Sequence, residues 1–131
     1  MKTTILVCSM LLLLSGLPID QELEPLVQVK TELYMGLSDR DGKPIPKRKW
    51  EAFKKGPLVD LLGGYTELPA NGYWRNEKGH AYTEKSVVIV YVHEHNSAED
   101  QKIDSLIALF KEEFDQESVL QIDTQVAYSF E

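Results

Sequence analysis

Cysteine is almost absent from this 131-residue chain, which has a single one, Cys8. Cys8 lies within the apolar run from Ile5 to Leu14, so the chain that follows it has no thiol. Beyond that run, the sequence excludes disulfide bonds and a cysteine nucleophile. We therefore expect the folded part of the protein to be held together by side-chain packing alone.

A surplus of basic residues is also lacking. The chain has 14 Lys and Arg against 21 Asp and Glu, which gives a formal net charge of −7. Proteins that bind nucleic acid need a positive surface facing the phosphates. The composition predicts no nucleic-acid partner, and the basic residues between Lys43 and Lys55 are interpreted as a solvated helix face.

Only one long apolar run is present, Ile5–Leu14, with Lys2 before it and Ser15-Gly16 after it. A run of this length is too short to span a bilayer comfortably and is typical of a secretory signal. We predict a signal peptide over residues 1–19, a tether over 20–26 and a single domain over 27–131. The protein is then exported, to the periplasm or beyond, with no stable membrane span after cleavage. Because the small-x-small pattern of a cleavage site is missing, an uncleaved membrane anchor is the alternative.

The first half of the domain alternates between strand and helix patterns. Period-two alternation over 27–35 predicts a first strand, with Val29, Thr31 and Leu33 facing inward. A helix is expected over 47–55, broken by Gly56-Pro57, with a short second piece to Leu62. Residues 65–75 then predict a strand interrupted near Pro69–Gly72, which indicates a bulge or an edge position.

The second half of the domain has the same order of strand, helix and strand. A turn over 76–79 leads into the strand that ends at His95. A helix with Ser97 as its N-cap follows, and a last strand covers 118–130. The order strand, helix, strand, strand, helix, strand predicts an α+β, ferredoxin-like βαββαβ sandwich: an antiparallel sheet with two helices on one face and the first and third strands in the middle.

Continuous apolar character from Val87 to His93 marks a central strand that is dry on both faces. We assign Val88, Val90 and Val92 to the face covered by helices. The opposite, open face of the sheet is then expected to carry residues from three strands: Lys30, Glu32 and Tyr34; Val87, Ile89, Tyr91, His93 and His95; Gln121, Asp123 and Gln125.

Three interpretations of this half-apolar open face remain. It could form a homodimer, because contiguous apolar patches usually mark contacts. It could hold a small-molecule pocket with Tyr34, Tyr91 and His93 as polar groups. It could also be covered by loops from residues 65–75 and bind nothing.

Two constellations suggest chemistry without establishing it. His93 and His95 share a strand face, but two ligands do not make a zinc site, so no metal and no cofactor is predicted. Tyr34, Glu32 and His93 could form an acid–base cluster if they lie within hydrogen-bonding distance. An ordinary cross-strand polar network is the alternative.

An aromatic and basic cluster lies at Asn71–Arg75. The ring of Trp74 and the guanidinium of Arg75 could bind sugars, aromatic groups or carboxylates. The alternatives are that Trp74 anchors the core and that Arg75 pairs with one of the many acidic residues.

Several segments together resemble one family. They are Thr31–Ser38, Trp50 with Phe53, Gly72–Arg75, Gln116–Leu120 and Tyr128–Phe130. This pattern is similar to the bacterial domain of unknown function 3574, found in small exported proteins and lipoproteins, over about Lys30 to Phe130. Members tend to have Gly-Gln-Trp where this chain has Gly72-Tyr73-Trp74, and many carry a lipoprotein cysteine that Cys8 does not provide. The resemblance implies a compartment and a fold, and no established activity.

The sequence thus favours a non-catalytic binding or interaction module that uses its open sheet face, with a second copy, a protein or a small molecule as partner. The alternative is a small dimeric enzyme acting on a small organic molecule through acid–base groups on that face. Whether the protein is an enzyme stays open. The residues proposed for this face are Tyr34, Glu32, Ile89, Tyr91, His93, Trp74 and Arg75.

Overall fold

Strand β1 (Gln28–Gly36) opens the part of the chain that the computed structural model describes, residues 26–131. Helix α1 (Lys47–Phe53), a π-helical turn (Lys54–Leu58) and helix α2 (Val59–Leu62) follow it. The remaining elements are β2 (Thr66–Arg75), β3 (Ala81–Glu94), α3 (Ser97–Glu113) and β4 (Leu120–Gln125). The expected signal peptide, most of the tether, and Cys8 lie outside these residues.

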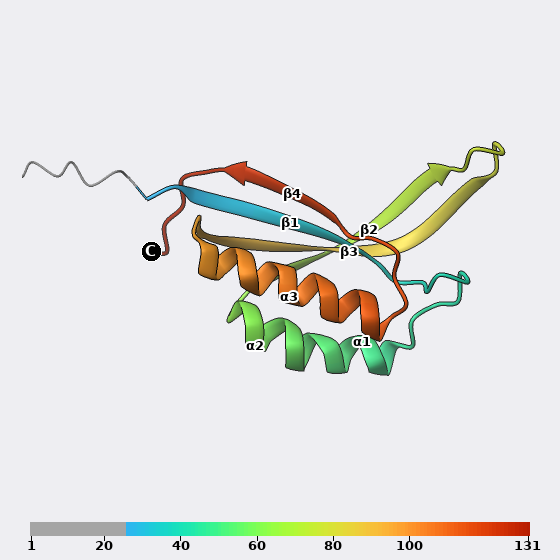
Figure 1. Cartoon of the computed structure of the whole chain (residues 1–131), viewed down its shortest axis with the longest axis horizontal. Coiled ribbons are helices and arrows are strands. Elements are labelled where there is room, and N and C mark those ends of the chain that lie inside the picture. The colour runs from blue at the N-terminus through green and yellow to red at the C-terminus, as the bar shows by residue number, and fades with distance from the viewer. Residues whose placement is uncertain (1–25) are drawn as a thin grey trace, which may run out of the picture.

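The four strands form one antiparallel sheet in the order β2-β3-β1-β4. β1 and β3 are the two central strands, as predicted from the order of the elements. Both helical segments lie on the same side of the sheet (Figure 1). The predicted α+β, ferredoxin-like class is therefore confirmed.

Strand β2 is continuous, and the interruption expected near Pro69 is absent. Its pairing with β3 runs in one register from Thr66↔Val90 to Arg75↔Ala81, with Pro69 opposite Val87. Because β2 is an edge strand, a proline can be accommodated where its nitrogen faces away from the ladder. The edge position was therefore the correct alternative. The hairpin of β2 and β3 continues beyond the helices (Figure 1).

The helix break expected at Gly56-Pro57 is also absent. The chain continues through both residues as a π-helical turn that joins α1 to α2. A π-turn loosens the helical ladder locally, so a proline that cannot donate a hydrogen bond fits inside it. Lys54, in the same turn, forms salt bridges from its Nζ to Glu51 Oε1 and to Glu67 Oε2, each at 2.9 Å. These salt bridges connect the helix to β2.

The residue that caps α3 differs from the prediction by one position. The side chain of Asn96, not Ser97, accepts a hydrogen bond from the Glu99 backbone N–H at 2.9 Å. Asn96 is the last residue with an extended backbone, which is the geometry an N-cap requires. The final strand is shorter than the expected 118–130 and ends at Gln125.

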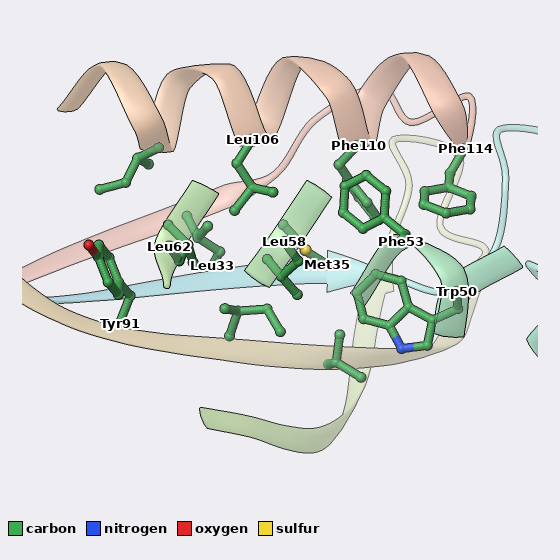
Figure 2. Close-up of a cluster of buried hydrophobic side chains, with 13 residues drawn as sticks. Leu33, Met35, Trp50, Phe53, Leu58, Leu62, Tyr91, Leu106, Phe110 and Phe114 are labelled. Atoms are coloured by element: carbon green, nitrogen blue, oxygen red, sulfur yellow. The ribbon is translucent and has the colours of Figure 1, made fainter. Parts of the chain in front are cut away.

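The hydrophobic core lies between the sheet and the helices. Figure 2 shows Phe110 of α3 and Phe114, the residue after α3, packed against Trp50 and Phe53 from α1, with ring centroids 5.2–6.2 Å apart. Leu33 and Met35 of β1 complete the floor of this cluster and are fully buried.

The expected facing of β3 is wrong by one residue. Val87, Ile89 and Tyr91 lie beneath the helices in the core cluster, and Figure 2 shows Tyr91 there. Val88, Val90 and Val92 instead pair with Tyr34, Glu32 and Lys30 on the open face. Both faces of this strand are apolar, so alternation alone does not decide which set faces the helices.

The same inversion applies to β4. Gln121 and Asp123 pair with Leu33 and Thr31, whose side chains face the helices. Leu120, Ile122 and Thr124 therefore share the open face with β1 residues Tyr34, Glu32 and Lys30.

Candidate functional site

The open face, corrected in this way, is more apolar than the sequence predicts. Its central rows hold Val88, Val90 and Val92 from β3 beside Tyr34 of β1. Its edges hold Leu68 of β2, and Leu120 and Ile122 of β4. No helix of the described chain covers this side of the sheet (Figure 1).

The edge residues of the open face are substantially exposed. Leu68 is 48% exposed, Leu120 58% and Ile122 39%. The charged residues in the same rows, Lys30 and Glu32, form an ion pair at 3.3 Å. The open face thus combines exposed aliphatic side chains with locally balanced charge, and such a patch usually marks a contact surface.

The residues predicted for the site do not lie together. Tyr34 and Glu32 are on the open face, as expected. Ile89, Tyr91 and His93 are 0%, 8% and 5% exposed and lie on the helix-covered face, so their expected place on the open face is wrong. The sheet separates His93 from Tyr34 and Glu32, and the proposed acid–base cluster of these three residues is not assembled.

His93 belongs instead to a polar network with Thr31 and Asp123. Thr31 Oγ1 lies 2.8 Å from His93 Nε2 and donates to Asp123 Oδ1 at 2.6 Å. The other ring nitrogen, Nδ1, lies 2.8 Å from the backbone oxygen of Glu94. Thr31 is fully buried, so these bonds satisfy polar atoms that water does not reach.

A second polar group continues this network toward α3. The ring of Tyr91 stacks on that of His93, with centroids 4.9 Å apart, and its hydroxyl donates to Glu99 Oε2 at 2.5 Å. Lys102 Nζ contacts the other carboxylate oxygen of Glu99 at 2.7 Å. Burial raises the pKa of Tyr91 far above its usual value of 10, and the bond to Glu99 adds to this shift.

Glu99 shifts in the opposite direction. Burial raises the pKa of its carboxyl, but the hydrogen bonds from Lys102 and Tyr91 outweigh burial and hold the pKa below the usual 4.5. Tyr91 therefore stays protonated and donates to the ionised carboxylate of Glu99, an arrangement that stabilises the fold. These contacts tie β3 to α3.

A groove of about 690 Å³ lies at the other end of the sheet. Three segments form it: the loop after β1, the hairpin of β2 and β3, and the connection from α3 to β4. Its lining includes Trp74, Tyr82 and Glu84 from the hairpin, with Asp39 and Asp115 from the loops.

Trp74 and Arg75, predicted as one cluster, lie on opposite sides of β2. Trp74 lines the groove and stacks on Tyr82, whereas Arg75 Nη1 donates to the Gly79 carbonyl oxygen at 3.3 Å within the hairpin turn. Sequence reasoning missed Tyr82 and Glu84. The register Trp74↔Tyr82 is the signal that would have found them, since it places both rings side by side.

The histidines form no metal cluster. Across residues 26–131, no group of three or more His, Cys, Asp or Glu side chains could hold a metal ion. His95 Nδ1 lies 3.9 Å from Asp100 Oδ1 at the start of α3. Within the same residues, no helix is long and apolar enough to cross a membrane.

The sequence and the structure of this chain were compared with those of known proteins. The model of a family described as "Protein of unknown function (DUF3574)" matches residues 30–130. No curated protein matches the chain in sequence. A phage SAM lyase in complex with S-methyl-5'-thioadenosine has a similar structure, with a TM-score of 0.58, 18% identity, and coverage of 75% of this chain and 81% of the lyase. Its apo state gives a TM-score of 0.55, also at 18% identity, over 76% of this chain and 81% of that one. CutA from Synechococcus elongatus PCC7942 gives 0.48 at 8% identity, over 79% and 80%.

Proposed function

This chain belongs to DUF3574, a family of proteins of unknown function, and we propose that it is a non-catalytic interaction module whose open sheet face binds a second copy of itself. One observation carries the proposal: exposed Leu68, Leu120 and Ile122 flank the valines of β3 on a sheet face without a helical cover. Removing such side chains from water stabilises a contact by roughly 25 cal/mol per Å² of apolar surface.

Charge favours a second copy as the occupant. The whole chain carries a formal net charge of −7, so two copies repel each other over most of their surface. Along the central rows of the open face, the charges of Lys30 and Glu32 cancel within one ion pair. Two copies that meet through these central rows bring apolar side chains together where the charges are balanced within each copy.

The molecular mass in solution tests this proposal. All described strands, helices and core residues lie within 26–131, so the protein starting at Asp20 is suitable. We expect the wild type to be a dimer and Ile122→Glu to be a folded monomer. Leu109→Glu is the matched control, because Leu109 is 44% exposed but lies on α3. A monomeric wild type, or a dimer that survives Ile122→Glu, would reject the open face as the interface.

We also propose that the protein is exported. The support is the apolar run Ile5–Leu14 behind Lys2. Cell fractionation followed by mass spectrometry of the intact protein checks it: we expect protein outside the cytoplasm that lacks the first residues. A full-length protein in the membrane fraction would favour the uncleaved anchor, and a cytoplasmic protein would exclude export.

A second candidate function is an enzyme acting on a small organic molecule. The observation that favours it is the groove lined by Trp74, Tyr82 and Glu84 in a fold shared with a phage SAM lyase. One such activity is tested by incubating the protein with S-adenosylmethionine. Chromatography then detects any S-methyl-5'-thioadenosine that is released. Release of S-methyl-5'-thioadenosine by the wild type and not by Glu84→Gln would replace the non-catalytic proposal, and absence of release would remove this activity.

A further inference from the structure

The groove is built by segments that are far apart in the sequence. The loop Ser38–Gly42 and the connection Asp115–Ser118 form one side, and the β2–β3 hairpin forms the other. Gln116, 8% exposed, donates from Nε2 to the backbone oxygen of Ser38 at 2.5 Å, and the Arg40 backbone N–H donates to that of Asp115 at 3.1 Å. These bonds hold the two loops together, so the groove does not depend on a ligand for its shape.

One wall of the groove is an exposed aromatic surface. The rings of Trp74 and Tyr82 stack with centroids 4.4 Å apart and an angle of 14° between their planes. Trp74 is 53% and Tyr82 42% exposed, so this pair is not a core anchor. Asn76 Nδ2 donates to the Tyr82 hydroxyl at 3.3 Å, which helps to fix the ring in place. The stack covers the two inner ring faces and leaves the outer faces for a ligand.

The remaining lining is strongly acidic. Five carboxylates and a single guanidinium line the groove, namely Asp39, Asp41, Glu84, Asp115 and Glu117 with Arg40. Arg40 Nε is already engaged by Asp115 Oδ1 at 3.6 Å. Asp39 accepts hydrogen bonds from the backbone N–H groups of Asp41 and Lys43. The groove thus presents a negative potential that one paired arginine does not balance.

Glu84 is the carboxylate that β3 contributes to the groove. Its carboxylate rests against Gly36 at the end of β1, where an added Cβ would lie 2.6 Å from Glu84 Oε1. Glycine at this position lets the carboxylate lie over the backbone of β1. Among the described residues, Glu84 has no side-chain hydrogen bond or ion pair, so its negative charge is available to a ligand.

We propose that this groove binds a small organic cation, a quaternary ammonium or sulfonium group, which packs on an outer ring face of the Trp74–Tyr82 stack and faces the Glu84 carboxylate. Aromatic faces attract such cations because the ring quadrupole is negative there, and alkylated cations are weakly hydrated. A bare metal ion fits the groove less well, because no group of three or more ligating side chains converges in the described chain. The inference depends neither on self-association nor on catalysis.

Titration of the full chain with choline at low ionic strength tests the proposal. The neutral isostere 3,3-dimethylbutan-1-ol is the matched probe, because it has the same shape without the charge. We expect choline to bind and the alcohol to bind at least about tenfold more weakly, since carboxylates and π faces both select the cation. Absence of choline binding, or equal binding of the two probes, would overturn the proposal.

Two variants locate the site. Trp74→Ala is expected to weaken choline binding about fivefold, the effect of losing one cation–π contact at a partly exposed site. Glu84→Gln is expected to weaken it by a similar factor and to reduce its dependence on salt. Tyr73→Ala and Glu77→Gln are the matched controls, because Tyr73 is 75% exposed and neither residue lines the groove. Loss of binding in a control equal to that in the test variant would also overturn the proposal.

Trp74 is exposed and Glu84 half-buried, and circular dichroism checks that each variant is folded before titration. The titration and the mass measurement of self-association give separate readouts. A monomer that binds choline through Trp74 would reject the interface and support the groove. A dimer that does not bind choline would do the reverse.

Discussion

Thr31 on β1 and His93 on β3 are hydrogen-bonded across the two central strands, with Thr31 Oγ1 2.8 Å from His93 Nε2. The same hydroxyl donates to Asp123 on β4. One buried threonine therefore links three neighbouring strands by side-chain bonds, in addition to the backbone ladder.

Thr31→Val keeps the shape of the side chain and removes this link. We expect the free energy of unfolding to fall by about 1–3 kcal/mol, because the buried imidazole loses a partner that water cannot replace. Urea denaturation measures the change. Thr124→Val is the control, since Thr124 is exposed on the open face and should change stability by less than about 0.5 kcal/mol. Equal effects of the two substitutions would show that the Thr31 hydroxyl does not stabilise the fold.

The lowered pKa of Glu99 predicts how the free energy of unfolding depends on pH. The pKa of its carboxyl is held below 4.5 in the folded protein by Lys102 and Tyr91, against the effect of burial. A carboxyl with a lowered pKa stabilises the fold above its unfolded pKa, and this contribution is lost as the pH falls through the folded value. We expect Glu99→Gln to be less stable than the wild type at pH 7, with the difference shrinking below about pH 4.5.

Thermal unfolding between pH 7 and pH 3 checks this expectation. Glu112→Gln is the control on the same helix, because Glu112 is exposed. A stability difference between wild type and Glu99→Gln that stays constant over this range would show that the ionised carboxylate is not what the Tyr91 and Lys102 contacts stabilise.

Phe110 is the central ring of the aromatic cluster beneath α3. It is fully buried and lies 5.3–6.2 Å, between ring centroids, from Trp50, Phe53 and Phe114. We expect Phe110→Ala to lower the free energy of unfolding by about 3–5 kcal/mol, through lost burial and the cavity that remains. The neighbouring Leu109→Ala, on the exposed side of α3, should cost much less. A small effect of Phe110→Ala would mean that the surrounding rings collapse into the space.

Asn96 is the N-cap of α3, and its replacement distinguishes it from Ser97. Asn96→Ala removes the acceptor for the Glu99 N–H and is expected to cost about 1 kcal/mol. Ser97→Ala should change stability by less than about 0.5 kcal/mol, because Ser97 already lies inside the helix. If Ser97→Ala were the costlier change, the helix would begin one residue later than described.

The fold was predictable from the sequence because each element carries its own period. Val29, Thr31 and Leu33 alternate with polar residues on β1, and the structure buries all three. The stripe of Ile103, Leu106 and Phe110 likewise placed the buried face of α3. Such patterns fix both the type of an element and the side that it buries.

The facing of β3 was not predictable in the same way. From Val87 to Val92 every residue is apolar, so exchanging the two sets of side chains leaves the pattern unchanged. The choice depends on the partner strand: Leu33 is buried beneath the helices, and the register Leu33↔Ile89 carries Ile89 to the same side. Candidate site residues assigned from β3 alone were therefore placed on the wrong face.

The groove could not be predicted from the sequence for a different reason. Trp74 was visible as an aromatic in an irregular segment, but Tyr82 and Glu84 come from the opposite arm of the hairpin. The acidic residues at Asp39 and Asp115 come from loops 76 positions apart in the sequence, and their meeting depends on the bonds from Arg40 and Gln116. Contacts between loops have no period, so a linear pattern does not reveal them.

The length of β3 has a consequence for how the two proposed sites would behave. This single strand of 14 residues carries Glu84 at the groove and Val88 on the open face, an even number of residues apart and hence on the same side. A second copy seated on the valines would approach the side of β3 that carries Glu84. Occupancy of one site would then alter the affinity of the other by the same factor in both directions, so that the apparent affinity for a cation would vary with protein concentration.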